Sequence, residues 1–238
     1  MKYSQPDCSL DNLCINDKGL NCQAIFNIKS LPADVIENLE NNAVGLSNYT
    51  QLILIAHRGP SLWQYVAAEA VKSSHPVDDY SVSVLTECFQ QLKLDNQFEF
   101  IYPSDKAVDL QRLGELAGWH YTSPLNIGVN AHWGGWFAYR AVVLAKSNFE
   151  PTNAMKSYSP CIECQDKACI NSCPSQAVNN QGFKIQNCVE YRLTPDSQCK
   201  DKCLSRLSCP VAKELQYSDE QMRYHYGISL ETIKKYYS

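Results

Sequence analysis

Apolar and polar residues alternate along the chain with a helical period first and a strand-like run next, starting near Leu31. The segment LPADVIENLENN carries apolar residues at helical spacing and a proline in its first turn, which predicts a helix from Leu31. The following segment, Tyr49 to Ile55 (YTQLILI), is a short apolar run whose β-branched residues favour a buried strand. The patterned part of the chain therefore begins with a helix and a strand.

A turn is expected directly after this strand, made by His57, Arg58, Gly59 and Pro60, with a helix from about Ser61. A strand, a turn and a helix N-terminus in succession often bind an anionic or polar group. His57 and Arg58 are therefore candidate contacts for a phosphate or propionate group of a cofactor.

A longer amphipathic helix is predicted in the stretch HPVDDYSVSVLTECFQQL, which opens with a turn fixed by proline. Its apolar positions are Val82, Leu85, Phe89 and Leu92. Cys88 lies among them and is expected in the core. Phe98 to Tyr102 then alternates as a strand, and Ala107 to Ala117 has the pattern of a further helix.

The stretch SPLNIGVNAHWGGWFAYRAVVLAKS predicts two strands joined by a turn at His132 to Gly135, the second strand being Trp136 to Ala145. Alternating strands and helices predict an α+β fold class, in the form of a central-sheet α/β sandwich. We assign residues 31–150 to this domain, and the poorly patterned residues 1–30 to an N-terminal segment.

A second, smaller domain is expected after the sandwich. The polar, proline-bracketed segment PTNAMKSYSP has the composition of a linker and opens a cysteine-rich module that we place at residues 151–214. Residues 215–238 are expected to form a helical tail. In this tail Ser218 and Gln221 have capping-box spacing, and a second short helix is expected after Gly227.

The cysteines of the module fall into two halves, and each half ends in Cys-Pro. Eight of the twelve cysteines of the chain lie here: Cys161, Cys164, Cys169 and Cys173, then Cys188, Cys199, Cys203 and Cys209. Closely spaced cysteines closed by Cys-Pro are typical of bacterial ferredoxins. The pattern therefore predicts a ferredoxin-like module that binds two [4Fe–4S] clusters.

In two-cluster ferredoxins the cysteine of each Cys-Pro ligates the cluster of the other half. This crossing rule assigns Cys161, Cys164, Cys169 and Cys209 to one cluster and Cys173, Cys188, Cys199 and Cys203 to the other. The assignment is a hypothesis, because the gap before Cys169 and the gaps around Cys203 are wider than usual.

Disulfides and zinc are the alternatives. The sequence begins MKYSQPDCSL without an apolar signal segment, so we expect a cytoplasmic protein in a reducing compartment that disfavours disulfides. Zinc sites often use two Cys-x2-Cys pairs, and only Cys161 and Cys164 make such a pair here. The remaining Cys8, Cys14 and Cys22 are irregularly spaced and are expected to be packing residues.

Composition narrows the classes of function. With 238 residues and 45% hydrophobic content, the chain is long enough for a substantial core beside a small module. No apolar run approaches the roughly 20 residues that cross a bilayer, and the net charge of −4 comes without a dense basic block. We therefore expect neither a membrane nor a nucleic acid as a partner.

The middle of the chain resembles the cobalamin-processing chaperones of the cblC type. The shared motifs are a Pro-Val-Asp helix start, an Ala-Gly helix end and the block GGWFAYR, in the same order, and the ending YSDEQMRYHYGISLETIKKY is also similar. The same region followed by eight cysteines resembles epoxyqueuosine reductases and reductive dehalogenases. Here AGWHYTSPLNIG replaces the Gly-Trp-Ile-Gly-Lys block of the epoxyqueuosine reductases.

This resemblance implies a nitroreductase-like first domain that holds a corrinoid, with the clusters delivering electrons to its cobalt. Reducing Co(II) to Co(I) needs a very low potential, and [4Fe–4S] clusters reach down to about −700 mV. The candidate corrinoid contacts that it implies are Arg140, His132, Trp133, Gly134 and Gly135. It also points to Asp105, near the position where epoxyqueuosine reductases carry a proton-donating aspartate, as a candidate catalytic residue.

Three of these candidates also have a purely structural interpretation. Arg140 can be an ion-paired arginine, His132 an ordinary turn residue and Asp105 a solvated loop aspartate.

Three functions therefore stay open. The chain is a corrinoid-dependent or corrinoid-processing reductase fed by a ferredoxin-type or flavodoxin-type donor of low potential, an electron-transfer protein without corrinoid, or a cobalamin carrier with structural clusters.

Overall fold

The computed structural model describes residues 15–42, 45–69, 73–94 and 97–237, which fall into two compact units. The first unit comprises the described chain up to Gly118 together with Phe137–Met155, and the second comprises Trp119–Trp136 together with the chain from Lys156 onward. Cys8 and Cys14 lie outside the described residues. None of the helices in the described ranges is both long and apolar enough to cross a membrane.

The first unit is built on a four-stranded antiparallel sheet with the strand order β1-β2-β6-β3. Its strands are β1 (Cys22–Asn27), β2 (Gln51–Arg58), β3 (Phe98–Tyr102) and β6 (Phe137–Ala145). The two central strands carry the core, since every residue of β2 from Leu52 to Ala56 is fully buried. Each buried Leu or Ile there contributes about 1.5–3 kcal/mol, so this sheet is the stable part of the unit.

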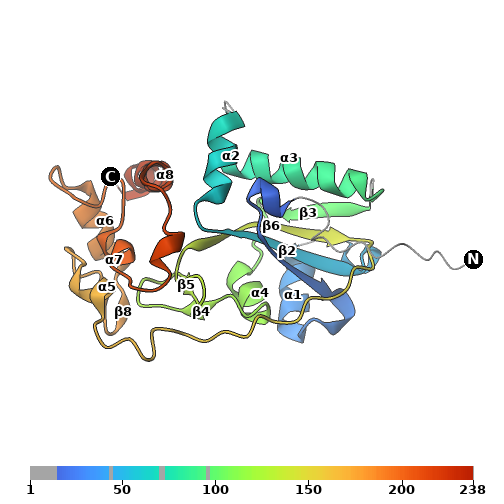
Figure 1. Cartoon of the computed structure of the whole chain (residues 1–238), viewed down its shortest axis with the longest axis horizontal. Helices are drawn as coiled ribbons and strands as arrows, with labels where there is room; N and C mark the ends of the chain where they lie inside the picture. The colour runs from blue at the N-terminus through green and yellow to red at the C-terminus, as the bar shows by residue number, and fades with distance from the viewer. Residues whose placement is uncertain (1–14, 43–44, 70–72, 95–96, 238) are drawn as a thin grey trace, which may run out of the picture. The chain divides into compact units, whose positions relative to one another are not determined.

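Helices cover both faces of this sheet. α2 (Ser61–Glu69) and α3 (Pro76–Gln91) lie on one face, and α1 (Ala33–Asn42) and α4 (Leu110–Leu116) lie on the other (Figure 1). α3 buries Tyr80, Leu85, Cys88 and Phe89 against the core, close to the apolar face that its sequence predicts. The predicted α+β sandwich with one central sheet is confirmed.

β2 is longer than the sequence pattern predicts. His57 and Arg58 pair with Ala138 and Phe137 of β6, so they belong to the strand, and the expected turn at these two residues was wrong. The chain turns only at Gly59, which has a φ of 72° that glycine adopts without a steric penalty. Helix α2 begins at Ser61, as predicted.

A strand lies on each side of the predicted turn at His132 to Gly135, but the two strands do not pair with each other. β5 (Gly128–Val129) pairs with β4 (Tyr121–Thr122), whereas β6 pairs with β2 and β3. The turn is held instead by Asn130, whose side-chain Oδ1 accepts hydrogen bonds from the backbone N–H groups of His132 and Trp133. This Asx-type turn lets the chain leave β5 without pairing it to β6.

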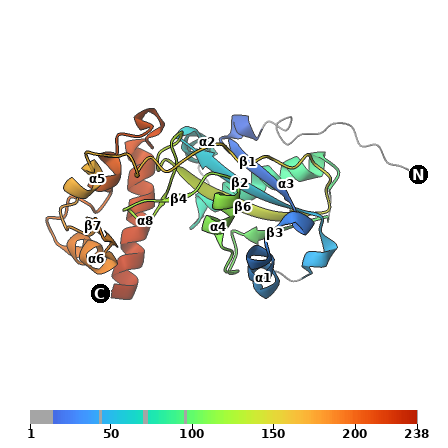
Figure 2. The ribbon, with the colours of Figure 1, turned by 90° about the horizontal axis from the view of Figure 1, so that it is seen from below.

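The second unit consists of short elements and one long helix. These are the β4-β5 pair, α5 (Ala168–Asn171), β7 (Val178–Asn179), β8 (Gly182–Phe183), α6 (Ile185–Leu193), α7 (Leu204–Leu207) and α8 (Asp219–Tyr237). Figure 2 shows α8 as one uninterrupted helix beside α6. Ser218 accepts the Gln221 N–H at 3.2 Å, as the capping box predicts, but the expected break at Gly227 is not there. A single glycine costs a helix only about 1 kcal/mol, which packing of α8 offsets.

The core of the second unit is sparse. One cluster joins Trp136, Tyr217 and Met222, and few other apolar side chains of this unit are fully buried. Helices of four residues, such as α5 and α7, do not persist on their own propensity. The unit therefore depends on polar anchors and on whatever its cysteines bind.

Residues 119–136 group with the cysteine-rich unit, although the sequence analysis placed them in the range 31–150. The reason lies in their contacts. Trp136 stacks edge-on against Tyr217 with ring centroids 5.5 Å apart, and Tyr121 donates a hydrogen bond to the carbonyl of Ser157 at 2.7 Å. Residues close in sequence to β6 thus build the second unit.

Candidate metal centre

Four cysteines gather at the start of α5 and the end of α7. Burial raises the pKa of the Cys161 thiol, and the neighbouring thiols of Cys209, Cys169 and Cys164 raise it further because negative charges placed so close would repel. Cys169 lies in α5, and Cys209 follows α7. These four residues are the group that the crossing rule assigns to one cluster.

The other four cysteines gather around α6. Burial raises the pKa of Cys188 to about 11, an effect that Arg192 opposes and that the thiols of Cys203, Cys173 and Cys199 reinforce. Cys188 lies within α6, while Cys203 immediately precedes α7. The membership again follows the crossing rule, and the role of these residues as cluster ligands stays a prediction.

In the second group, the surroundings of the Cys173 sulfur favour its thiolate form. Burial alone would raise the pKa of its thiol, but hydrogen bonds from Ser175, the Val178 N–H and Ser205 bring that pKa below its ordinary value. The Val178 nitrogen lies 3.5 Å from Sγ and the Ser175 Oγ 3.4 Å from it. Such donors favour the thiolate, which is the form that binds metal.

The donor chemistry of both groups fits iron–sulfur clusters. All eight thiols are free, as are Cys22 and Cys88 among the described cysteines. Within the described ranges, no three His, Cys, Asp or Glu side chains are close enough to hold a single metal ion. A cubane is larger than one ion and takes one thiolate on each iron, so its four ligands stand farther apart.

A cavity of about 30 Å³ lies against the first cysteine group, within the second unit. Three of the four cysteines of the group line it, together with apolar side chains and one arginine: Cys161, Cys169, Cys209, Leu125, Ile127, Trp136 and Arg206. The thiols therefore face an apolar, restricted space. Such surroundings control solvent access to a metal group.

Arg192 ties the second cysteine group to α8, and the sequence analysis missed it. Its buried guanidinium donates hydrogen bonds to the carbonyls of Cys199, Lys200 and Tyr226 and to the Ser229 hydroxyl, at 2.7–3.2 Å. A detectable signal exists, because Arg192 follows Cys188 by four residues in a helix and therefore shares its face.

The candidates His132 and Trp133 hold their turn within the second unit. The Nε2 atom of His132 lies 3.0 Å from the carbonyl oxygen of Lys156. The Trp133 side chain is buried, with its ring 5.6 Å from that of Trp119. The His132 contact agrees with its interpretation as an ordinary turn residue.

Gly134 and Gly135 allow a close approach of two backbone segments. A Cβ atom at Gly134, which has a φ of 55°, would lie 2.6 Å from the carbonyl oxygen of Val211. The carbonyl of Gly135 accepts a hydrogen bond from Arg206 at 2.6 Å. The Gly-Gly pair therefore packs against the chain that follows Cys209.

The remaining cofactor candidates lie in the first unit. Arg140 is largely buried and its Nη1 lies 3.7 Å from the Asp78 carboxylate, which is the ion-paired arrangement considered above. His57 is fully buried in the sheet, while Arg58 at the end of β2 is exposed. The His57 side chain is therefore closed off from solvent, whereas that of Arg58 is open to it.

Asp105 is exposed on the loop after β3 and lines an open cavity of about 610 Å³. Its other lining residues come from the start of α3 and from the same loop: His75, Asp78, Asp79, Val82, Ser83, Tyr102, Pro103 and Ser104. The volume is in the range of ligand sites. Asp78 joins this cavity to Arg140, so the structure brings these two candidates, Asp105 and Arg140, to the same region.

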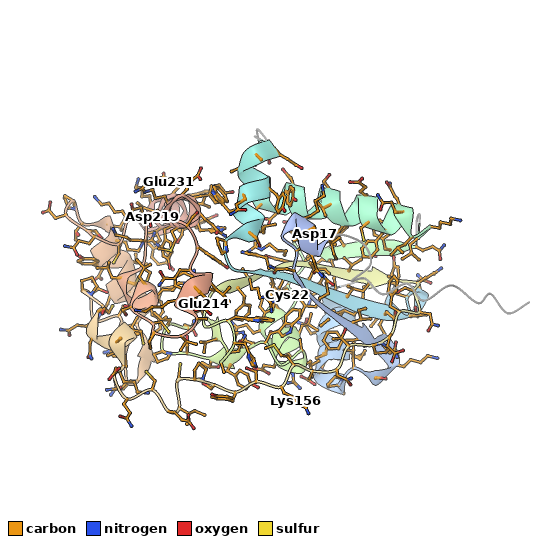
Figure 3. All side chains as sticks on the ribbon, in the orientation of Figure 1. Asp17, Cys22, Lys156, Glu214, Asp219 and Glu231 are labelled. Carbon is orange, nitrogen blue, oxygen red and sulfur yellow. The ribbon has the colours of Figure 1, made fainter. Side chains whose placement is uncertain are left out.

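Cys22 and Cys88 take the packing roles that the sequence predicts. Cys22 lies on β1, where burial raises the pKa of its thiol to about 12 (Figure 3). Cys88 is buried on α3. Both thiols are buried in the first unit.

The fold resembles two kinds of solved protein. Epoxyqueuosine reductase from Bacillus subtilis matches with a TM-score of 0.53 and 14% identity over 88% of this chain and 67% of that one. The CblC B12-trafficking protein from C. elegans matches with a TM-score of 0.51 and 13% identity over 94% of both chains. At these identities the likeness concerns the fold, and it confirms the resemblance seen in the sequence.

A further epoxyqueuosine reductase structure gives a TM-score of 0.53 at 16% identity, again with 88% of this chain and 67% of the other covered. This chain thus spans about two thirds of the length of those enzymes. No protein-family model and no curated protein sequence matches it.

Proposed function

We propose that this protein is an iron–sulfur redox protein that passes electrons through two [4Fe–4S] clusters to a corrinoid held by its first unit. The observation that carries the proposal is the pair of all-cysteine groups, each with the membership expected of crossed ferredoxin ligands. It would act as a corrinoid-dependent or corrinoid-processing reductase.

The cysteines that would hold the clusters are Cys161, Cys164, Cys169 and Cys209 for one, and Cys173, Cys188, Cys199 and Cys203 for the other. Bound there, the clusters supply one-electron transfer at potentials down to about −700 mV. The thiols that are partly shielded from solvent and the hydrogen bonds to Cys173 support this assignment. A ferredoxin-type or flavodoxin-type protein of low potential is the donor that we expect.

The fold that this chain shares with a B12-trafficking protein supports a corrinoid as the acceptor. In the first unit, Arg140 keeps its buried Nε without a hydrogen-bond partner within the described ranges, and its Nη1 reaches Asp78 at the 610 Å³ cavity. We assign Arg140 to binding an acidic or amide side group of the corrinoid, and Asp105 to proton transfer at the mouth of that cavity. Orientation and access are what a protein supplies in such chemistry.

Iron analysis tests the cluster part of the proposal. Anaerobically purified and reconstituted protein should be brown and hold about eight irons for each chain. Substituting Cys173→Ser should remove one cluster's electron paramagnetic resonance signal, whereas Cys22→Ala, a change at a buried thiol of the first unit, should leave the iron content unchanged. Colourless protein with far less iron would contradict the proposal.

Hydroxocobalamin tests the corrinoid part. Added to the anaerobic protein, it should shift to the absorption spectrum of the base-off corrinoid, and Arg140→Ala should weaken its binding about tenfold. With no shift and no retained corrinoid, the protein is instead an electron-transfer protein without corrinoid. If the corrinoid binds but its Co(II) form receives no electrons from dithionite-reduced clusters, the protein is a carrier with structural clusters.

A further inference from the structure

The indole of Trp136 is buried beside the first cysteine group. Trp136 is 0% exposed, and its Nε1 has no hydrogen-bond partner within the described ranges. It lines the same cavity as Cys161, Cys169 and Cys209. A tryptophan N–H can only donate, and it usually finds an acceptor when it is buried. The described protein atoms supply no acceptor for this one.

Two side chains of the second unit hold the Trp136 ring in place. The guanidinium carbon of Arg206 in α7 lies 4.6 Å from the ring centroid, and Tyr217 packs edge-on with centroids 5.5 Å apart. Arg206 is fixed in turn, because its Nη2 donates a hydrogen bond to the carbonyl of Gly135 at 2.6 Å. A ring packed in this way does not rotate toward solvent to find a partner for its N–H.

A second buried donor lines the same cavity. The Nε of Arg206 is buried and, in the part of the chain that the structure describes, has no hydrogen-bond partner either. Buried polar groups are almost always hydrogen-bonded, so two such donors around one small cavity call for an explanation. Together they point to an acceptor inside this cavity.

Water and sulfur are the two acceptors to compare. A space of about 30 Å³ is large enough for one water, but a buried water makes about three hydrogen bonds to polar groups. Apart from Ser123, the side chains that reach the cavity from residues 123–129 are apolar: Pro124, Leu125, Ile127 and Val129. A [4Fe–4S] cluster brings sulfurs that accept hydrogen bonds. Cluster sulfur therefore fits the two donors better than water.

We propose that Trp136 donates its indole N–H to a sulfur of the first cluster and thereby raises the reduction potential of that cluster. The cluster gains negative charge when it takes up an electron from the donor protein. A hydrogen bond to one of its sulfurs therefore stabilises the reduced form more than the oxidised form. The inference rests on the proposed function, because it needs the first cluster.

Nitrogen-15 placed at the indole nitrogen of tryptophan tests the contact in the full chain with reconstituted clusters. In the dithionite-reduced protein, pulsed electron paramagnetic resonance should detect magnetic coupling between a cluster and a labelled indole nitrogen. Trp136→Phe should abolish this coupling, and Trp119→Phe should preserve it. No indole coupling in the unmodified protein would overturn the inference.

Redox titration tests the effect on the potential. Trp136→Phe keeps an aromatic ring against Arg206 and Tyr217 and removes the N–H. It should lower the equilibrium constant for reduction of one cluster about tenfold, a shift of about 59 mV for one electron, and leave the other cluster unchanged. Trp119→Phe is the matched control in the same unit, because Trp119 is buried against Trp133 and does not line the cavity. A shift of the same size in this control would contradict the inference.

Iron content separates the remaining outcomes. Full iron with both potentials unchanged in Trp136→Phe overturns the inference and leaves the proposed function standing. If Trp136→Phe fails to hold its iron, the nitrogen-15 coupling in the unmodified protein decides. An unmodified protein that binds no clusters overturns the proposed function, and this inference with it.

Discussion

Gly134 and Gly135 show how one motif serves packing within the second unit. Sequence resemblance singled out this pair as corrinoid contacts, and the structure gives both a backbone task beside Val211 and Arg206. The need for glycine at position 134 is steric, since a side chain there would meet a carbonyl oxygen and the φ of 55° disfavours other residues.

Gly134→Ala should destabilise the second unit by about 2 kcal/mol or more, because overpacking costs 1–3 kcal/mol and the left-handed backbone adds about 1–2 kcal/mol. Chemical denaturation of the reconstituted protein, followed by the loss of cluster absorbance, measures this change. Gly227→Ala is the control, since a Cβ there meets nothing within 4 Å in the middle of α8. It should be neutral or stabilising by up to about 1 kcal/mol, and equal effects of both substitutions would contradict the steric argument.

At the scale of elements, periodicity predicted most of the first unit. Phe98–Tyr102 forms a strand with the expected bounds, and α1, α2 and α3 lie where their apolar patterns indicate. β1 was missed because Cys22–Asn27 has no regular alternation and is fixed as a strand by pairing with β2. Non-local pairing of this kind leaves no mark in a short window of sequence.

The candidate metal centre was also predicted only in part. Cysteine spacing predicted which residues group together, because ligand chemistry constrains the spacing directly. The residues around the cysteines escaped prediction: Arg192 and Arg206 look like ordinary charged residues of short helices, and only the fold buries them. Their contacts come from α8 and from the segment before β6, which are distant in sequence.

At the scale of the whole molecule, the two units differ in what stabilises them. The first has a continuous apolar sheet, whereas the second has one small core and short helices. Metal binding contributes directly to folding where a site cannot persist without it. The proposed clusters, once bound, are therefore expected to hold the second unit together and to matter little for the first.

Removing iron with a chelator under anaerobic conditions should unfold the second unit and leave the sheet of the first intact. Amide hydrogen exchange measured by mass spectrometry would show fast exchange in peptides covering α6 and α8, while peptides of β2 and β6 stay protected. Uniform loss of protection along the chain would mean that the units fold as one. Full protection of α6 and α8 would mean that the clusters carry no folding energy.

The chain passes from one unit to the other after Gly118, after Trp136 and after Met155. A fragment that starts at the first cysteine pair would lack Trp136, and with it the ring partner of Tyr217 and Arg206. Transplanting residues from the first cysteine pair onward into another protein would therefore transfer only part of the second unit. In this architecture the cysteine-rich unit is complete only together with the loop that precedes β6.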